Sequence, residues 1–227
     1  MSRVCPRISG TPTAAGKHCP KKVGTVPLTV GVLALQGDVD EHRNALSDLG
    51  ARPVAVRRPS DLAGVDALVI PGGESTAIIK LADAFEMTEP LQHAVQSGVP
   101  VLGSCAGMVL LAREVLDGEP GQTTFGGLDI TVRRNAFGRQ VDSFEEDITI
   151  AGVEGGPMRA IFIRAPWVET VGEDVEVLAR TSQAYHADKV VAVAQGSVMA
   201  CSFHPELTPD RRLHALFLQR VKGGSGR

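Results

Sequence analysis

The sequence predicts an α/β fold in three layers: a mostly parallel sheet with helices on both faces and some antiparallel strands in its second half. From residue 28 onward, short apolar segments alternate with helical segments, which is typical of a parallel sheet. Beyond residue 127 the apolar segments are short, rich in β-branched residues and joined by turns, which favours antiparallel strands. A chain of 227 residues with 43% hydrophobic content can bury one sizeable core.

The first half predicts four strands, at residues 30–35, 53–56, 67–70 and 99–102. The helices expected between and after them are an amphipathic one at 39–49 and others at 76–85, 90–96 and 108–114. Ligands of parallel sheets bind at the carboxyl ends of the strands. The loops at residues 36–38, 71–75 and 104–106 follow such ends and are therefore the candidate site.

The second half predicts six further strands and a closing helix. The strands are expected at 128–132, 148–150, 160–163, 175–178, 190–194 and 198–203, and the helix at 209–221. Residues 28–222 are therefore interpreted as one domain, and the glycine-rich residues 223–227 as a flexible tail.

Residues 1–27 differ from the rest in composition. They carry five basic and no acidic side chains, whereas residues 28–227 carry 18 basic and 26 acidic ones, a net charge of −8. Prolines and glycines interrupt any periodicity, so a disordered basic tail is expected rather than a targeting signal. Cys5, His18 and Cys19 lack a fourth ligand and a regular spacing, so no metal site is expected. Four cysteines, one of them reactive, favour a reducing, cytoplasmic setting without disulfides.

Cys105 lies in a small-residue frame, Gly103-Ser104-Cys105-Ala106-Gly107, between an apolar strand and an apolar helix. This pattern is that of a nucleophile elbow with sulfur in place of oxygen, because the sharp turn leaves no room for neighbouring side chains. A lone buried cysteine would otherwise be a small core residue. Cys201 has no such frame and is interpreted as strand core.

His204 and Glu206 follow Cys105 by 99 residues and more, in the segment His204-Pro205-Glu206. A histidine supplies a base for the thiol, and a carboxylate two residues on orients the imidazole. The pattern predicts a Cys/His/Glu hydrolase. The alternative for a lone His-Pro pair is an ordinary turn.

The loop at residues 71–75 contains two glycines after an apolar strand, which lets backbone N–H groups approach an oxyanion closely. It is predicted to supply one oxyanion donor, at Gly73, alongside the backbone N–H of Ala106. The alternative is an ordinary Pro-Gly turn. The loop is not a phosphate cradle, because the lysine and hydroxyl residues of that motif are missing.

These segments together resemble the class I, triad-type glutamine amidotransferases, and more narrowly the glutaminase subunits of pyridoxal 5'-phosphate synthase. The resemblance covers roughly residues 28–222. The narrower match rests on four stretches and on the ending CSFHPELT at 201–208: GVLALQG at 31–37, PGGEST at 71–76, RNAFGRQVDSF at 134–144 and FIRAP at 162–166.

The resemblance implies that Cys105 attacks glutamine, that His204 transfers protons and that Glu206 orients His204. The residues it implies for glutamine binding are Gly73, Glu74, Ser75, Arg134, Ile163 and Arg164. Donors for a carboxylate and acceptors for an ammonium suit a zwitterionic amino acid. The alternatives are a surface role for Arg134, a strand-end ion pair for Arg164, and a helix cap for Glu74.

The resemblance also implies a partner, a separate synthase subunit that takes the ammonia and builds pyridoxal 5'-phosphate. Gln36, Asp38 and His42 are the contact positions proposed for it. No cofactor, metal, nucleic acid or membrane is expected, since no run approaches the roughly 18 apolar residues of a span and the acidic body disfavours polyanions. Other possibilities are a glutaminase serving a different synthase, a catalytically silent subunit and a peptidase of related fold.

Overall fold

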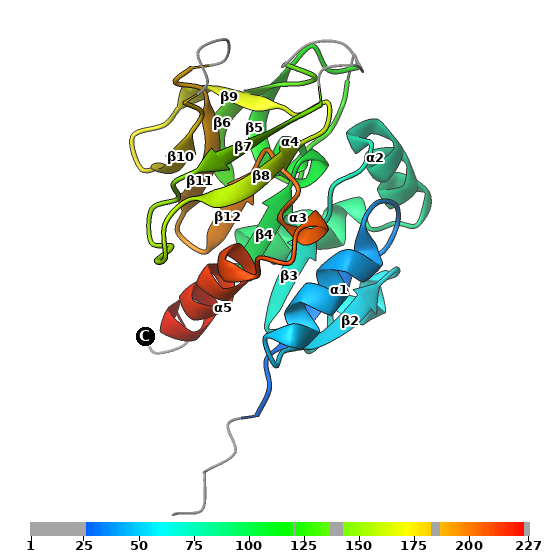
Figure 1. The fold of residues 1–227 in the computed structure, drawn as a ribbon. Coiled ribbons are helices and arrows are strands. Elements are labelled where there is room, and N and C mark those ends of the chain that lie inside the picture. Colours follow the sequence, from blue (N-terminus) through cyan, green and yellow to red (C-terminus); the bar gives the residue numbers. More distant parts are fainter. Residues whose placement is uncertain (1–25, 120, 137–142, 183–186, 225–227) are drawn as a thin grey trace, which may run out of the picture.

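The computed structural model describes residues 26–119, 121–136, 143–182 and 187–224. The expected disordered tail at 1–27, including Cys5, His18 and Cys19, lies outside these ranges except for its last two residues. Part of the RNAFGRQVDSF stretch, residues 137–142, also lies outside them, as do residues 225–227. Figure 1 shows the fold, with helices on both faces of a twisted sheet.

The first part of the main sheet is parallel, as expected. Its neighbours pair in the order β2-β1-β3-β4-β12, and each of these pairings is parallel. Parallel pairing places the carboxyl ends of these strands at one edge of the sheet. The strands are β1 (Thr29–Leu33), β2 (Arg52–Val56), β3 (Ala67–Ile70), β4 (Val101–Ser104) and β12 (Val198–Cys201).

The sheet continues beyond β12 with mostly antiparallel pairings, in the order β12-β11-β9-β6-β5, and β10 pairs with β11. Only β5 and β6 pair in parallel there. A separate antiparallel pair, β7-β8, packs over this part of the sheet (Figure 1). The bounds are β5 (Ala112–Leu116), β6 (Leu128–Arg133), β7 (Phe144–Ile148), β8 (Met158–Phe162), β9 (Trp167–Val171), β10 (Glu176–Arg180) and β11 (Val190–Gln195).

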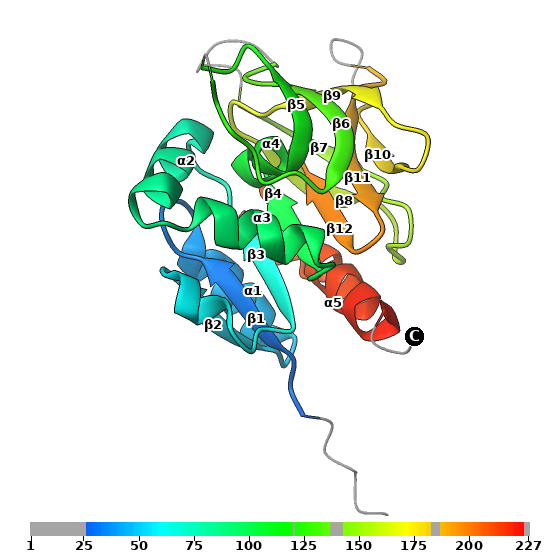
Figure 2. The same cartoon turned by 180° about the vertical axis from the view of Figure 1, so that it is seen from behind.

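Helices cover both faces because consecutive strand residues point to opposite sides. In β3, Ala67 and Val69 belong to one core cluster, whereas Leu68 and Ile70 belong to the other. The first cluster contains buried residues of α1 (Val39–Asp48) and α5 (Arg212–Gly224), which lie on the face turned to the viewer in Figure 1. The second contains buried residues of α2 (Ser75–Ala84), α3 (Thr88–Gln96) and α4 (Ala106–Leu111), and Figure 2 shows α3 across that face. Two 3-10 turns, η1 (Pro59–Leu62) and η2 (Pro205–Leu207), complete the elements.

Some predicted elements are wrong in extent, and some strands were not predicted. The helix expected at 108–114 is α4, which ends at Leu111, and residues from Ala112 onward form β5. The strand expected at 148–150 is β7, which ends at Ile148, and β9 was not predicted. An apolar run is ambiguous between helix and strand, and pairing with β6 decides for strand in β5.

The closing helix α5 starts and ends about three residues later than the sequence predicts, so Gly223 and Gly224 are helical. Among the residues that the structure describes, no helix has both the length and the apolar character needed to cross a bilayer.

Candidate active site

Cys105 sits at the turn between β4 and α4, with a left-handed backbone of φ 48° and ψ −103°. The turn is tight enough to require its glycines. A Cβ at Gly107 would lie 2.3 Å from the carbonyl oxygen of Ile70, and one at Gly103 would lie 2.7 Å from the backbone of Gly107. The backbone therefore has the sharp turn expected of a nucleophile elbow, and this turn places Cys105 at the carboxyl edge of the sheet.

His204 and Glu206 lie beside Cys105 at the same edge, just after β12. Their side chains are buried, and Nδ1 of His204 is 2.7 Å from Oε1 of Glu206. The η2 turn that begins at Pro205 places the carboxylate back against its own imidazole. Because β12 pairs with β4, the base arrives next to the nucleophile although 99 residues separate them.

The imidazole of His204 is strongly basic. Burial by itself disfavours the charged ring, but hydrogen bonds with Asp38, Cys105 and Glu206 outweigh it and raise the pKa of His204 to about 12. Burial raises the pKa of Glu206 above its usual value, against the opposing hydrogen bond from His204. His204 therefore carries a proton at neutral pH and can act as a proton donor beside Cys105.

Asp38 is a second carboxylate on the same imidazole. Its Oδ2 lies 3.3 Å from Nδ1 of His204, and its side chain is 37% exposed. The hydrogen bond with His204 holds the pKa of Asp38 below its usual value, despite partial burial. Asp38 was predicted as a partner contact, which stays a prediction; in the structure its side chain also reaches the imidazole of His204.

His42, the third predicted partner contact, is wrong for that role, because its side chain is wholly buried. A signal for this was available in the sequence. His42, Ala45 and Leu46 recur at the i, i+3 and i+4 spacing of the buried face of α1. Gln36 is half-buried, and its Oε1 accepts a hydrogen bond from the backbone N–H of Glu74 at 2.8 Å.

The loop at 71–75 follows β3, the neighbour of β4, as predicted. It runs close over the triad, since a Cβ at Gly72 would lie 2.4 Å from Cε1 of His204. Gln36 leaves no space for a side chain at Gly73, where a Cβ would lie 2.4 Å from its Oε1. Ala106 is the first residue of α4, and the first N–H groups of a helix have no partner within it.

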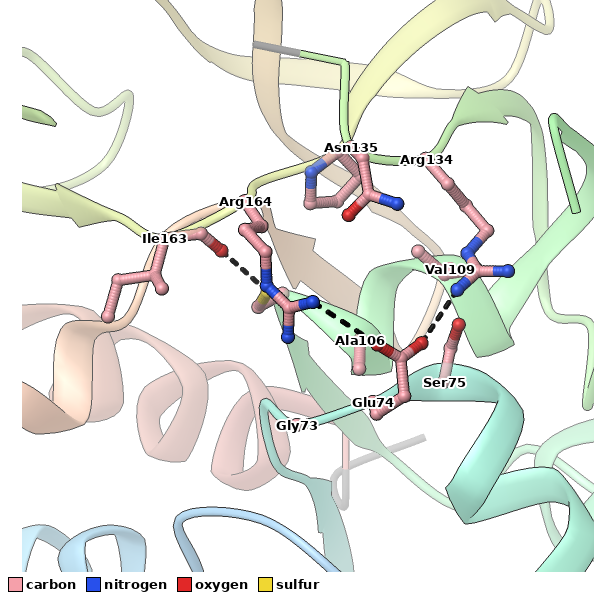
Figure 3. A pocket seen from close by; sticks show the side chains of 11 residues that line it. Gly73, Glu74, Ser75, Ala106, Val109, Arg134, Asn135, Ile163 and Arg164 are labelled. Carbon is pink, nitrogen blue, oxygen red and sulfur yellow. Dashed lines mark hydrogen bonds and ion pairs between the residues drawn. The ribbon is translucent and has the colours of Figure 1, made fainter. Parts of the chain in front are cut away.

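A pocket opens in front of Cys105 and has about 330 Å³ of empty space, its mouth included. All six predicted glutamine-binding residues line it (Figure 3). The lining residues are Gly73, Glu74, Ser75, Cys105, Ala106, Val109, Arg134, Asn135, Ile163, Arg164 and Pro166.

Glu74 stands between two arginines in this pocket (Figure 3). Its Oε1 is 2.6 Å from Nη2 of Arg134, and its Oε2 is 3.7 Å from Nη1 of Arg164. Glu74 is at the N-cap position of α2, yet it makes no side-chain cap hydrogen bond. A helix cap for Glu74 and a surface role for Arg134 therefore account for the observed contacts less well than a shared role in the pocket does.

Asn135 and Pro166 line the pocket and were not singled out from the sequence. Asn135 and Arg164 both have a left-handed backbone, with φ of 45° and 46°. Such a backbone in an arginine is uncommon and is concentrated at functional sites. Sequence alone gives no sign of it at Arg164.

Among the residues that the structure describes, Asp38, His204 and Glu206 form a group that could hold a metal ion, with one ligand atom each within 4.8 Å of the others. Two ligands of one zinc ion, each at about 2.0–2.2 Å from it, lie about 3.3 Å apart in tetrahedral geometry. The 2.7 Å between His204 and Glu206 is instead a direct hydrogen bond. The arrangement is that of a hydrogen-bonded triad.

Comparison with known proteins agrees with this chemistry. The model of the SNO glutamine amidotransferase family matches residues 32–223. The chain belongs to this family. The resemblance seen in the sequence is thus confirmed, and so is the glutaminase chemistry that defines an amidotransferase acting on glutamine.

Curated members of the SNO family are similar over most of their length. "Pyridoxal 5'-phosphate synthase subunit PdxT" of Acidothermus cellulolyticus is 65% identical over 85% of this chain and 93% of its own. The protein of the same name from Frankia alni is 61% identical over 87% of this chain and 98% of its own. These names support a role in vitamin B6 synthesis over a role with a different synthase.

Solved structures confirm the predicted fold class. A crystal structure of a glutamine amidotransferase superposes with a TM-score of 0.78 at 48% identity, over 85% of this chain and 98% of that one. PurLQS from Thermotoga maritima superposes with a TM-score of 0.61 at 15% identity, over 86% of this chain and 99% of that one, which shows a shared fold alone.

Proposed function

We propose that Cys105, His204 and Glu206 hydrolyse L-glutamine to L-glutamate and ammonia, and that the ammonia passes to a synthase subunit that makes pyridoxal 5'-phosphate. The observation that carries the proposal is the hydrogen-bonded His204–Glu206 pair beside Cys105, whose backbone is strained. Cys105 lines a pocket that also contains an acidic and two basic side chains, which suit the ammonium and the carboxylate of an amino acid. The family supplies the substrate class.

The reaction proceeds in two halves. The Cys105 thiolate attacks the side-chain amide carbon of glutamine, the C–N bond breaks, and His204 gives its proton to the departing nitrogen, which leaves as ammonia. A γ-glutamyl thioester remains on the sulfur. His204 then takes a proton from water, the hydroxide attacks the thioester carbon, and the C–S bond breaks to release glutamate. Glu206 stabilises the imidazolium at each stage.

The tetrahedral intermediates place a negative charge on the former amide oxygen. Backbone N–H groups of Gly73 and Ala106 are the proposed donors to it, on either side of Cys105. Donors fixed in the backbone need no reorganisation as the charge develops.

Glutamine recognition uses the charges in the pocket. Glu74 accepts from the α-ammonium group, Arg134 and Arg164 donate to the α-carboxylate, and Gly73, Ser75 and Ile163 complete the walls. In the structure these opposite charges pair with one another, at 2.6 Å and 3.7 Å. Bound glutamine exchanges those ion pairs for its own.

The setting of the reaction follows from the relatives, which are named as subunits of a synthase. We propose a cytoplasmic hetero-oligomer with the synthase subunit, with no cofactor in this chain and no nucleic acid or membrane as a partner. We also propose that residues 28–222 form one glutaminase domain and that residues 1–27 lie outside it, in accord with the family match at residues 32–223.

The test is glutamate release from glutamine by the purified chain, alone and with the synthase subunit. The proposal expects release that rises with the partner and disappears in Cys105→Ala, while Cys201→Ala, a change in the buried core of β12, leaves release intact per folded molecule. A rate of glutamate release that does not change when the synthase subunit is added would contradict the proposed assembly with that subunit. Release that survives in Cys105→Ala would contradict the mechanism.

A further inference from the structure

Two buried histidines lie behind the triad, and the mechanism above gives them no role. His42 in α1 and His214 in α5 are both 0% exposed. Nδ1 of His42 is 3.0 Å from Nε2 of His214, so the two rings form a hydrogen-bonded pair across the interface of the two helices. Buried polar groups at no exposure require partners, and a pair this deep is costly to keep without a function.

The other edge of His42 faces the catalytic machinery. Its Nε2 lies 2.9 Å from Oγ of Ser104, the residue before the nucleophile. The same nitrogen lies 3.3 Å from Oε2 of Glu206. Among the described residues that oxygen has no hydrogen bond of good geometry, so His42 is the polar group that serves it. The carboxylate of Glu206 thus has His204 at one oxygen and His42 at the other.

The proton positions follow from the network. Burial, then the charges of His214 and His204, hold the pKa of His42 well below its usual value, so the ring is neutral and carries one N–H. A lone pair on Nε2 would face the negative oxygen of Glu206 and be repelled, so the proton belongs on Nε2. This N–H makes its hydrogen bond with Oγ of Ser104 and lies close to Oε2 of Glu206, with 3.3 Å between nitrogen and oxygen.

His214 fixes that tautomer. Burial, followed by the charge of Arg211, lowers the pKa of His214 to about 4, so this ring is also neutral. With the proton of His42 on Nε2, its Nδ1 must accept, and Nε2–H of His214 is the donor. The remaining nitrogen of His214, Nδ1, is then a bare acceptor, which agrees with its lack of a partner in the structure. A buried acceptor without a hydrogen-bond partner is more common in proteins than a buried N–H without one.

We propose that His42 is a positioning residue of this glutaminase: its Nε2–H holds the outer oxygen of Glu206 and the base of the nucleophile elbow, and His214 locks it in the donating tautomer. The inference rests on the triad mechanism proposed above. It also gives α1 a defined place in that mechanism, because the loop before the helix already contacts the loop at 71–75 through Gln36 and the imidazole of His204 through Asp38.

The test compares two substitutions at one position. In His42→Gln the side-chain amide nitrogen reaches the place of Nε2 and keeps the donor, whereas in His42→Asn the shorter amide reaches only the place of Nδ1. The proposal expects kcat for glutamine, measured with the synthase subunit, to stay within about 3-fold in His42→Gln and to fall about 10- to 100-fold in His42→Asn, with KM little changed. His93→Gln, on the exposed face of α3, is the control.

A second readout separates positioning from folding. The proton that His204 shares with Glu206 gives a downfield NMR resonance, which can be observed without substrate. It should keep its position in His42→Gln and His93→Gln and shift in His42→Asn. Equal kcat and an equal resonance in folded His42→Gln and His42→Asn would overturn the proposal.

His214 provides an independent arm. His214→Leu removes the donor that fixes the tautomer, and His214→Gln keeps one. The proposal expects a smaller loss of kcat, about 2- to 10-fold, in His214→Leu alone, and no additional loss when it is combined with His42→Asn. Losses of kcat that add up in the double variant would contradict the proposed coupling between His42 and His214. If the native chain with its partner released no glutamate at all, the proposed function would fail, whereas the resonance would still decide whether His42 positions Glu206.

Discussion

At the residue scale, Cys105 combines an unfavourable backbone with a supporting ring of contacts. A cysteine at φ 48° and ψ −103° costs of order 1–3 kcal/mol, and surrounding packing must hold it there. This backbone places Cys105, itself nearly buried, in the wall of the pocket beside His204. Cys201, one strand over, shows the contrast, since burial raises its pKa well above the usual value and keeps it a neutral core thiol.

The role of Glu206 predicts a specific loss in Glu206→Gln. The amide keeps the shape but removes the charge that stabilises the imidazolium, so kcat should fall about 10²- to 10⁴-fold. The pKa of His204 should fall as well, because one of the hydrogen bonds that raise it is weakened. Steady-state kinetics and an NMR titration of His204 measure the two effects. Glu89→Gln, in the first turn of α3, is the matched control and should leave kcat unchanged. An unchanged kcat in Glu206→Gln would contradict the role of Glu206.

The role of Glu74 predicts a binding defect. Glu74→Gln keeps an acceptor oxygen but removes the negative charge opposite the substrate ammonium, and a lost charged hydrogen bond of about 1.5–3 kcal/mol corresponds to a rise in KM for glutamine of roughly 10- to 100-fold. Glutamine titration of the initial rate measures this. Glu119→Gln, which removes the exposed ion pair with Lys80, should leave KM unchanged. Equal KM values in both variants would refute the assignment of Glu74.

At the element scale, the elbow depends on close approach of β3 to α4. Gly107→Ala would place a Cβ 2.3 Å from the carbonyl oxygen of Ile70, so the free energy of unfolding should fall by about 1–3 kcal/mol or more. Urea unfolding measures the loss. Gly223→Ala, in α5 with nothing within 4 Å, is the control and should be neutral or stabilising, because alanine favours the helix more than glycine does. A neutral Gly107→Ala would mean that the elbow tolerates a side chain.

The parallel half of the sheet could be predicted from sequence, because each strand there is an apolar run closed by a loop with glycine or polar residues. The strand β3 was predicted with its observed bounds. The strands β5, β7 and β9 could not be predicted with their observed bounds, because their sequences AREVL, FEEDI and WVETV carry charged residues at exposed positions. These segments become strands because they pair with neighbouring strands. Local pattern is weak where tertiary pairing decides.

The triad and the pocket could be predicted because their residues stand in contiguous motifs at strand ends. The buried position of His42 could be predicted from its spacing with Ala45 and Leu46, but its partners and the contact of Asp38 could not, because they depend on how α1 is rotated about its axis and placed against the sheet. That rotation turns His42 inward with Ala45 and Leu46 and brings the N-terminal end of the helix to the triad.

At the scale of the whole molecule, the His42–His214 pair joins α1 to α5 and makes stability depend on pH. Burial lowers the pKa of His214 to about 4 in the folded protein, against 6.5 for an ordinary histidine in water, so folding keeps it neutral. Stability from this shift is present above pH 6.5 and is lost as pH falls toward 4, by about 3 kcal/mol at most. His204, whose pKa is raised to about 12 in the folded protein, loses its proton only in the unfolded state, around pH 6.5. Its contribution to stability is therefore complete below that pH and declines only as pH rises above it.

This dependence predicts that the difference in stability between the native chain and His214→Gln changes with pH. The native chain should lose about 3 kcal/mol relative to the variant between about pH 7 and pH 4, because glutamine does not titrate. Urea unfolding at a series of pH values measures the difference. His93→Gln should show no such trend. A difference that stays constant across this range would show that His214 does not titrate as the structure implies.

The central claim is that glutamine is hydrolysed through a thioester on Cys105. Mass spectrometry of the protein, quenched in acid during turnover of glutamine with the synthase subunit present, tests it most directly. The account predicts a glutamyl adduct on the peptide that carries Cys105, absent from Cys105→Ala and chased away when glutamine is removed before quenching. Glutamate release without any adduct on that peptide, or with the adduct on another residue, would contradict it.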